Sequence, residues 1–386
     1  MKTTNENKIP IKSWVSDIED GALAQANNLA NLPFAFRHIA IMPDSHQGYG
    51  MPIGGVMATA NVIVPNAVGV DIGCGMCAVK TSLKEIDTDT LKKIMGEIRK
   101  VIPLGFNKHK EKQDRNLMPE GTTGEIIVEE RQNAEKSLGT LGGGNHFIEI
   151  QKGDDGHIWI MVHSGSRNLG FKVANHYNKL ANDLNEKWHS SVPKNWELAF
   201  LPVDSKEGQN YIKEMQYCVD FALANRKVMM DRIKQAMEHV LAKSGILFDC
   251  DEIINIAHNY AQLENHFGKN VWVHRKGATL AQEGTIGIIP GSQGTSSYIV
   301  EGLGNRESFM SCSHGAGRIM GRKQAQRTLS LEDEQKKLKG VIHSIRGVKD
   351  LDEAPGSYKD INRVMDNQKD LVKILVKLSP IAVIKG

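Results

Sequence analysis

The sequence is poor in cysteine and lacks any long apolar segment. Its 386 residues include five cysteines, an odd and sparse set that argues against a disulfide framework, so we expect reduced thiols. No run of about 20 apolar residues occurs, and residues 1–9 are polar, so neither a membrane span nor secretion is indicated. We therefore expect a cytoplasmic protein. The cysteines are Cys74, Cys77, Cys218, Cys250 and Cys312.

A strong excess of charge of either sign is also missing. The chain has 48 Lys and Arg against 45 Asp and Glu, which gives a formal net charge of +3. Any nucleic acid must therefore be bound by a local basic patch rather than by the whole surface. Hydrophobic residues make up 40% of the chain, enough for a sizeable core, which argues against disorder and against a fibrous fold.

Two common signatures of nucleotide chemistry are absent as well. The sequence contains no G-x-x-x-x-G-K-[ST] loop of the P-loop type. It also has no lysine in the K-x-D-G setting of the lysine-dependent nucleotidyl transferases. Nucleotide chemistry in this chain would therefore need a different nucleophile.

Glycine, in contrast, is abundant and clustered. The 37 glycines exceed the usual share of about 7%. They gather in blocks at 69–75, 139–144 and 291–304, each after an apolar, β-branched run. Glycine allows positive φ and a close approach of the backbone to a ligand, as in phosphate and metal sites, although any one block would also fit a simple tight turn.

Short apolar runs and helical periodicities interleave along the chain without a repeat, which predicts an α/β chain folded around one site. The charged, apolar-poor segment 105–131 predicts an exposed loop, and 205–243 predicts a long helix. A second basic stretch, 318–339, fits either solvated surface or a basic rim of an RNA-binding cleft. Strands are expected at 38–42, 55–64, 157–163, 253–258, 271–274, 285–289 and 381–384, and helices at 89–100, 167–188, 205–243 and 358–378.

Five candidate metal ligands lie in glycine-rich or strand-end positions, namely Asp71, Cys74, His146, His163 and His258. They exceed the needs of one tetrahedral zinc, and a thiolate can bridge two ions, so a two-metal site is the economical interpretation. The ligand set does not select among manganese, zinc, cobalt and iron. Taken singly, each histidine would more often be a hydrogen-bonded core residue; the five together favour metal.

Cys74 and Cys77 form a C-x-x-C pair. No second pair accompanies it, so a four-cysteine zinc site is unsupported. A thioredoxin-like role is weaker because Asp71 precedes the pair and glycines surround it, rather than the pair opening a helix. We expect Cys74 to be a ligand beside Asp71, with Cys77 a buried neighbour.

His314 lies among small residues, followed by Gly315, Ala316, Gly317 and Arg318, which leaves room for a bulky ligand. A neutral imidazole, the dominant form above a pKa of about 6.5, can attack phosphorus, so His314 is a candidate phosphate-carrying nucleophile. The alternative is a structural histidine that caps a helix. The loop 290–297 follows an apolar strand with glycines and hydroxyls that suit phosphates or a base.

These motifs, with residues 43–46, 273–278, 352–358 and 383–386, resemble the RtcB family of RNA ligases from about residue 14 to 386. The resemblance implies one catalytic domain over 1–386, α/β (α+β), with mixed β-sheets and flanking helices around a central two-metal cleft. The family joins an RNA 3′-phosphate or 2′,3′-cyclic phosphate to a 5′-hydroxyl, using GTP and two Mn²⁺ ions.

The resemblance also implies a role for individual residues. Asp71, Cys74 and His146 would hold one ion, Cys74, His163 and His258 the other, and His314 would carry GMP. Arg167, Lys276 and Arg318 would face phosphates. The residues around GTP would be Asn145, Glu149, Asn259, Pro290, Gly291, Ser292, Gln293, Ser297, His314, Gly315, Ala316, Gly317, Tyr358 and Lys385.

The expected partners are RNA ends and GTP, with an archease-like activator as a further candidate, no membrane, and a monomeric state. Gln293 stands where the family usually has methionine, and the choice between tRNA splicing and RNA repair stays open. A rival hypothesis is a metal-dependent phosphoesterase that opens 2′,3′-cyclic phosphates without ligation, which would not need His314. A non-catalytic RNA-binding protein would lack ligands that are present here.

Overall fold

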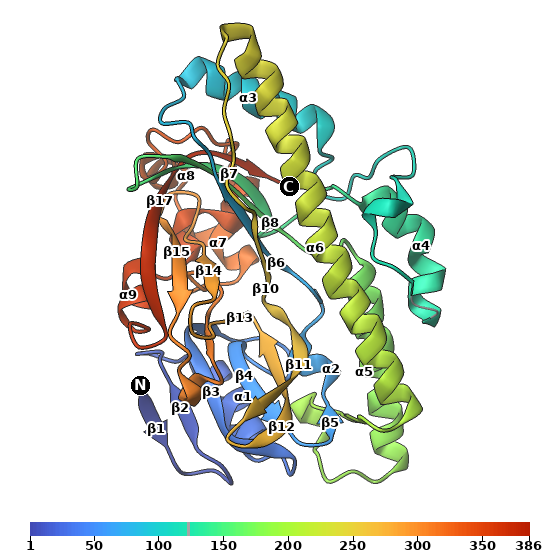
Figure 1. Ribbon diagram of the computed structural model, residues 1–386. Coiled ribbons are helices and arrows are strands. Elements are labelled where there is room, and N and C mark those ends of the chain that lie inside the picture. The colour runs from blue at the N-terminus through green and yellow to red at the C-terminus, as the bar shows by residue number, and fades with distance from the viewer. Residues whose placement is uncertain (122–123) are drawn as a thin grey trace.

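The computed structural model describes residues 1–121 and 124–386, which form a mixed α/β fold built on two large β-sheets (Figure 1). Two small two-stranded sheets, β5–β9 and β13–β16, complete the strands of this part of the chain. Their bounds are β5 Val62–Ile63, β9 Leu201–Pro202, β13 Ala278–Leu280 and β16 Ser311–Ser313. The expected class, α/β of the α+β kind, is confirmed.

The six-stranded sheet has the order β1-β2-β3-β4-β12-β11. All neighbours are antiparallel except β2 and β3. Helix α1 (Asp20–Ala30) covers one face, where Leu29 packs with Ile39 and Ile41. The strands are β1 Lys2–Thr4, β2 Ile11–Ser13, β3 Ala35–His46, β4 Ile53–Thr59, β11 Asn259–His266 and β12 Lys269–Lys276.

The seven-stranded sheet has the order β10-β6-β8-β7-β17-β15-β14 and is antiparallel throughout. Its side chains alternate between two buried faces: Cys77 and Val79 pack under α3 and α6, whereas Met76 and Ala78 belong to the opposite cluster. The strands are β6 Gly75–Lys80, β7 Phe147–Gly153, β8 Ile158–Ser164, β10 Ile254–Ala257, β14 Ile286–Ile289, β15 Ser297–Gly302 and β17 Val372–Lys385.

The long helix α6 (Lys206–Leu241) crosses most of the height of the molecule, with α3 near its upper end and α5 beside its lower half (Figure 1). The Ser205 hydroxyl caps its first turn by accepting a hydrogen bond from the backbone N–H of Gly208 at 3.0 Å. The other helices are α2 Pro65–Val68, α3 Thr88–Val101, α4 Glu125–Ser137, α5 Leu169–Lys187, α7 Arg322–Thr328, α8 Leu331–Lys337 and α9 Ile361–Asp366.

Short 3₁₀ segments connect several of these elements. They are η1 Arg115–Leu117, η2 Lys194–Trp196, η3 Ala242–Ser244, η4 Arg306–Ser308, η5 Val348–Glu353 and η6 Pro355–Ser357.

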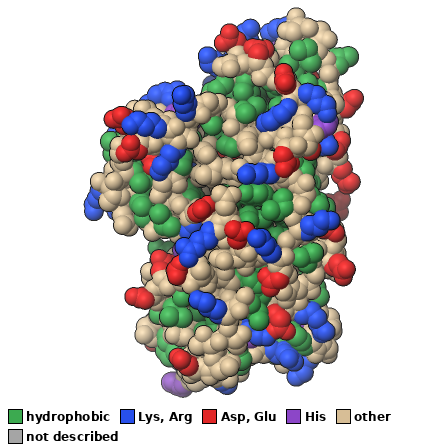
Figure 2. Space-filling model, turned by 90° about the vertical axis from the view of Figure 1, so that its left-hand side faces the viewer, with side chains coloured by type: hydrophobic (Ala, Val, Ile, Leu, Met, Phe, Trp, Pro, Cys, Tyr) green, Lys and Arg blue, Asp and Glu red, His purple; other side chains and the backbone are tan. Residues whose placement is uncertain are grey.

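In the part of the chain that the structure describes, no helix is both long and apolar enough to cross a lipid bilayer. Figure 2 shows one face of the molecule on which basic and acidic side chains are interspersed with apolar ones.

The helices expected at 89–100, 167–188 and 205–243 are confirmed as α3, α5 and α6. The helix expected at 358–378 is wrong. There the structure has the six-residue α9 followed by β17 from Val372. The run of Val372, Ile374 and Val376 is β-branched, and both neighbouring strands, β7 and β15, offer it a hydrogen-bonding ladder. Tertiary pairing therefore overrides the helical spacing.

Two other expectations are corrected in part. The single strand expected at 55–64 is two strands, β4 and β5, because Asn61 adopts left-handed backbone with φ 61°. The loop expected at 105–131 ends in helix α4 from Glu125, whose Ile127 is buried in a core cluster with Tyr211. Residues 122 and 123 of that segment lie outside the described residues.

Candidate functional site

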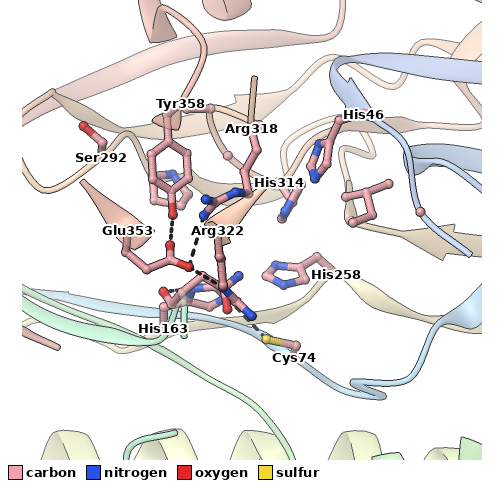
Figure 3. A pocket seen from close by; sticks show the side chains of 18 of the residues that line it. His46, Cys74, His163, His258, Ser292, His314, Arg318, Arg322, Glu353 and Tyr358 are labelled. Atoms are coloured by element: carbon pink, nitrogen blue, oxygen red, sulfur yellow. Dashed lines mark hydrogen bonds and ion pairs between the residues drawn. The ribbon is translucent and has the colours of Figure 1, made fainter. Parts of the chain in front are cut away.

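A cavity of about 910 Å³ is lined by residues from both large sheets. His46 at the end of β3 and Lys276 on β12 belong to the six-stranded sheet, and Glu149 on β7 and His163 on β8 belong to the seven-stranded sheet. Figure 3 shows the side chains of His46 and His163, with those of His258 and His314, converging on one space. The volume is at the upper end of the range of about 300–1,000 Å³ that is usual for ligand pockets.

Cys74 lies at the centre of a cluster of potential metal ligands on one side of this cavity. Its Sγ atom is 3.3 Å from Nε2 of His146 and 3.3 Å from Nε2 of His163. Two groups share this sulfur: in Asp71, Cys74 and His146, and again in Cys74, His163 and His258, the ligand atoms lie within 4.8 Å of one another. A sulfur shared by both groups could bridge two ions.

Strand pairing brings these residues together from distant parts of the chain. Gly75, directly after Cys74, pairs with Ser164 of β8 on one side and with Ala257 of β10 on the other. The strand ends that precede His258 and follow His163 therefore meet beside the loop that carries Cys74. The backbone N–H of His258 also donates to the carbonyl oxygen of Cys74 at 2.9 Å.

The loop before Cys74 is held against helix α6. Gly73 has φ 78°, and a Cβ atom there would lie 2.8 Å from the carbonyl oxygen of Cys218, so only glycine fits. The buried guanidinium of Arg226 on α6 donates to the carbonyl oxygens of Gly73 and Ser164, each at 2.9 Å. Arg226 thereby fixes two backbone segments near the thiol, the loop before Cys74 and the end of β8.

The electrostatics of the cluster fit a bound cation. Burial holds the pKa of His163 and of His258 well below its ordinary value, so both imidazoles are neutral and have lone pairs to offer. Nδ1 of His163 faces the carbonyl oxygen of Asn145 at 3.1 Å, which leaves its Nε2 for the cluster. Among the described residues, the buried Nδ1 atoms of His146 and His258 have no hydrogen-bond partner.

The pKa values of the two acidic ligands, Asp71 and Cys74, shift in opposite directions. Burial would raise the pKa of Asp71, but the hydrogen bond and charge of His146 and the nearby Arg167 lower it overall. Burial and the adjacent Asp71 raise the pKa of the Cys74 thiol well above its usual range. A coordinated cation supplies the positive charge that a thiolate needs in such a place, so the donor set fits divalent metal.

His314 follows β16 and is fixed by a buried carboxylate. Its Nδ1 lies 2.6 Å from Oδ2 of Asp44, and its backbone N–H donates to the same oxygen at 3.1 Å. A carboxylate only accepts, so Nδ1 carries the proton of the neutral ring and the lone pair is on Nε2. The ring lies edge to face with His258, at 4.8 Å between centroids (Figure 3).

Glycines keep the surroundings of His314 open. A Cβ atom at Gly277 would lie 3.0 Å from Cε1 of His314. Gly317 has φ 75°, and a Cβ atom there would lie 2.1 Å from the carbonyl oxygen of Asp44. Glycine at 277 lets the backbone approach the ring closely, and glycine at 317 lets it approach the backbone of Asp44.

Another part of the cavity wall offers polar groups suited to a base. Glu149 is buried, which raises its pKa to about 8, and the amide of Gln151 donates to its Oε2 at 2.6 Å. Burial lowers the pKa of the Lys385 ammonium, which neighbours Glu353 and Glu149. Ser297 lies behind the 290–293 loop, where its hydroxyl oxygen accepts from the backbone N–H of Gly291 at 3.2 Å.

Most of the residues that the sequence predicts for the site line this cavity. Three do not. His146 touches Asp71 and Cys74 from behind, Ser297 supports the loop as described, and Arg167 donates to the hydroxyl of Thr140 at 2.9 Å. Those that line it are Asp71, Cys74, Asn145, Glu149, His163, His258, Asn259, Lys276, Pro290, Gly291, Ser292, Gln293, His314, Gly315, Ala316, Gly317, Arg318, Tyr358 and Lys385.

The ammonium group of Lys276 contacts backbone carbonyl groups. Its Nζ donates to the carbonyl oxygens of Tyr49 and Asn66, and burial lowers its pKa to about 7. Lys276 is nevertheless among the residues that line the cavity. The role toward phosphates that the family resemblance implies for Lys276 stays a prediction.

Three functional candidates were missed from the sequence: Asp44, Glu353 and Arg322. Oε1 of the buried Glu353 lies 3.1 Å from Nη1 of Arg318 and 2.8 Å from Nε of Arg322, and the hydroxyl of Tyr358 donates to its Oε2 (Figure 3). Asp44 and Glu353 stand inside motifs that carried the family resemblance, 43–46 and 352–358, and Arg322 stands in the basic stretch 318–339. Nothing in those patterns distinguishes them from solvated charges.

The fold and the cavity define a mixed α/β protein with a candidate two-metal centre beside a fixed histidine. The chain belongs to the RtcB family: the family model described as "tRNA-splicing ligase RtcB" matches residues 25–130 and 115–386.

Similar proteins cover nearly the whole chain. It is 38% identical over 405 residues to the "RNA-splicing ligase RtcB" of Escherichia coli K12, an alignment that covers 99% of this chain and 98% of that protein. It is 32% identical over 444 residues to the "tRNA-splicing ligase RtcB" of Thermococcus kodakarensis, which covers 95% of this chain and 92% of that protein.

Proposed function

We propose that this protein is an RNA ligase that joins a 3′-phosphate or 2′,3′-cyclic phosphate end to a 5′-hydroxyl end with GTP as co-substrate. One observation carries the proposal: His314, with Nδ1 fixed at 2.6 Å from Asp44, lies against the ligand cluster at His258, in a cavity large enough for a nucleotide. The names of the E. coli and Thermococcus relatives, both splicing ligases, support the same class.

Two divalent ions, Mn²⁺ in this proposal, would be held by Asp71, Cys74 and His146 and by Cys74, His163 and His258. When bound, they would neutralise the charge of phosphate oxygens during transfer. The protein's contribution is to present the thiol and the neutral imidazoles at fixed strand ends, and to keep the carboxylate of Asp71 ionised beside His146.

His314 acts as the nucleophile in this proposal. Its Nε2 lone pair attacks the α-phosphorus of GTP, an N–P bond forms, the bond from that phosphorus to the bridging oxygen breaks, and pyrophosphate leaves. Asp44 retains the Nδ1 proton through a charge-assisted hydrogen bond and stabilises the positive ring. Pre-organised groups of this kind lower the barrier because they need no reorientation.

The remaining steps return the histidine to its free state. An oxygen of the RNA 3′-phosphate attacks the phosphorus of the GMP held on His314, and the N–P bond breaks. The 5′-hydroxyl oxygen then attacks the 3′-phosphorus and gives up its proton to solvent. The bond from that phosphorus to the GMP oxygen breaks, so GMP leaves and a phosphodiester remains. A cyclic phosphate would first be opened by water to the 3′-phosphate.

Recognition of guanine is assigned to Glu149 and Lys385. A carboxylate accepts from N1 and N2 of guanine, and an ammonium donates to O6. The other groups proposed around GTP are Asn145, Asn259, Pro290, Gly291, Ser292, Gln293, Ser297, Gly315, Ala316, Gly317 and Tyr358, and the groups proposed to face phosphates are Arg167, Lys276, Arg318 and Arg322.

The test is transfer of label from [α-³²P]GTP to the protein in the presence of Mn²⁺. We expect an acid-labile adduct that is lost in His314→Ala and kept in His176→Ala, a matched change at an exposed histidine on α5. If the wild-type protein forms no adduct but still opens 2′,3′-cyclic phosphates, the phosphoesterase alternative is correct. Sealing of tRNA halves compared with nicked ribosomal RNA would separate tRNA splicing from RNA repair.

A further inference from the structure

The loop of residues 47–50 carries an aromatic side chain that the proposed chemistry does not use. Tyr49 lines the cavity yet is 68% exposed. Two other apolar residues of the lining, Ile319 and Val70, are also exposed. Among the exposed aromatic residues of the described chain, which include Phe106 and Trp188, Tyr49 is the one that lines this cavity.

The backbone of this loop is held in place on every side. Gly48 and the side chain of Gln25 exchange two hydrogen bonds, of 3.0 and 2.7 Å. The backbone N–H of Gly50 donates to a carboxylate oxygen of Glu197 at 3.1 Å. Lys276 donates to the carbonyl oxygen of Tyr49 itself. The Tyr49 ring is therefore exposed although hydrogen bonds fix the backbone of its loop.

The ring itself has no partner. Within the described residues, the Tyr49 ring contacts no other aromatic ring or cation, and its hydroxyl makes no hydrogen bond. A large apolar ring held in water on a fixed backbone gives nothing to the fold, and it loses little conformational entropy when a flat ligand stacks on it. Stacking of bases on aromatic side chains is the usual way in which proteins hold single-stranded nucleic acid.

The position of the loop favours a stacked ligand other than the guanine of GTP. Figure 3 shows His46, where β3 ends, on the opposite side of His314 from Tyr358 and Ser292, which belong to the proposed guanosine wall. Lys276, which holds this loop, also donates to the carbonyl oxygen of Asn66, in the segment that leads to Asp71. The loop therefore lies beside the part of the cavity that carries the candidate metal ligands. RNA is the other base-bearing substrate of the proposed reaction.

We propose that Tyr49 is a stacking platform for the unpaired base next to the RNA end that is being joined, with Ile319 and Val70 forming the apolar edges of the slot. This inference rests on the proposed function. The site selects unstacked RNA ends rather than a sequence, because every base offers a π face.

The direct test uses RNA with 2-aminopurine as the base next to the end. Stacking quenches its fluorescence. We expect quenching by the wild-type protein, no quenching by Tyr49→Ala, and retained quenching by Tyr49→Phe and Tyr49→Trp. Leu247→Ala, at an 89% exposed leucine beyond the end of α6, is the control for loss of an exposed apolar side chain and should quench as the wild type does. Probes on the 3′-phosphate strand and on the 5′-hydroxyl strand identify which strand is held.

Kinetics give a second measurement. We expect Tyr49→Ala to raise KM for RNA by about 5- to 150-fold, the range that loss of one stacked base gives. Labelling with GTP alone reports the rest of the site: absence of an adduct in the wild-type protein would reject the proposed function, not the platform. Equal quenching and equal KM for Tyr49→Ala and wild type, on both strands, would overturn the platform.

Discussion

Nδ1 of His314 lies 2.6 Å from Oδ2 of Asp44, and Asp44 is fully buried. The two residues come from different layers, since Asp44 is on β3 of the six-stranded sheet and His314 follows β16. The pair fixes both the tautomer and the orientation of the imidazole. A single isosteric substitution of Asp44 therefore tests the role of this pair directly.

Replacing Asp44 with Asn should slow formation of the protein–GMP adduct by at least about 100-fold, because an amide can present N–H to Nδ1 and stabilise the wrong tautomer. The rate is measured by labelling with [α-³²P]GTP. Circular dichroism should show an intact fold, since Asn has the same shape. Asp17→Asn, at an exposed carboxylate, is the control. An unchanged labelling rate in Asp44→Asn would mean that the contact has no role in the chemistry.

Replacing Cys74 with Ala should remove both metal ions together, because both ligand groups share its sulfur. Metal content after gel filtration, measured by mass spectrometry, checks this. Cys77→Ala is a matched control, since Cys77 is equally buried but faces the core under α3 and α6. Retention of one full equivalent of metal in Cys74→Ala would reject a bridging thiolate.

GTP affinity should increase as the pH rises from about 6 to 9. The pKa of Glu149 is raised to about 8 by burial, so below that pH the free protein holds a protonated carboxyl, while guanine N–H groups require the carboxylate. Binding must then release a proton, and a lower proton concentration favours it. Isothermal titration in buffers of different ionisation enthalpy measures the released proton.

The matched variant for this pH dependence is Glu149→Gln, which cannot titrate. It should bind GTP more weakly and with a flatter pH profile. A wild-type affinity that is constant between pH 6 and 9 would show that Glu149 does not change its protonation when the nucleotide binds.

Replacing Glu353 with Gln should lower the free energy of unfolding by about 1–3 kcal/mol, because a buried acceptor of charged hydrogen bonds is lost while Arg318 stays mostly buried. Urea denaturation measures it. Glu332→Gln, at an exposed ion pair with Lys336, should change stability by less than about 1 kcal/mol. Equal effects of the two changes would indicate that the Glu353 contacts are as weak as surface ion pairs.

The grouping of the candidate metal ligands was predictable where the sequence marks it locally. Cys74 and His163 could be predicted because glycines and strand ends mark, in the sequence itself, where backbone and ligand approach each other. The partner of His314 could not be predicted, because Asp44 is 270 residues away and only the packing of β16 against β3 brings it near. The basic character of Lys276 likewise gives no hint that its ammonium bonds to two carbonyl groups.

The fold shows the same contrast between features that the local sequence encodes and features that tertiary contacts determine. The 36-residue helix α6 follows from its own periodicity and from Ser205 as its cap. The segment of β17 has a helical spacing as well, and its strand conformation is set by β7 and β15, which lie elsewhere in the chain. No local pattern could have decided between the two.

The place of β17 inside the seven-stranded sheet has a consequence for the order of folding. The cluster around Cys74 is assembled by strands β6, β7, β8 and β10, which lie within residues 75–257, and by the loop before β6. Helix α6 lies behind these strands. Glu149 gains Val383 as its neighbour, and Lys385 reaches Phe147, only when β17 pairs with β7 across a long sequence separation. Closing so large a loop is slow, so the wall proposed for guanine should form after the cluster around Cys74 during refolding.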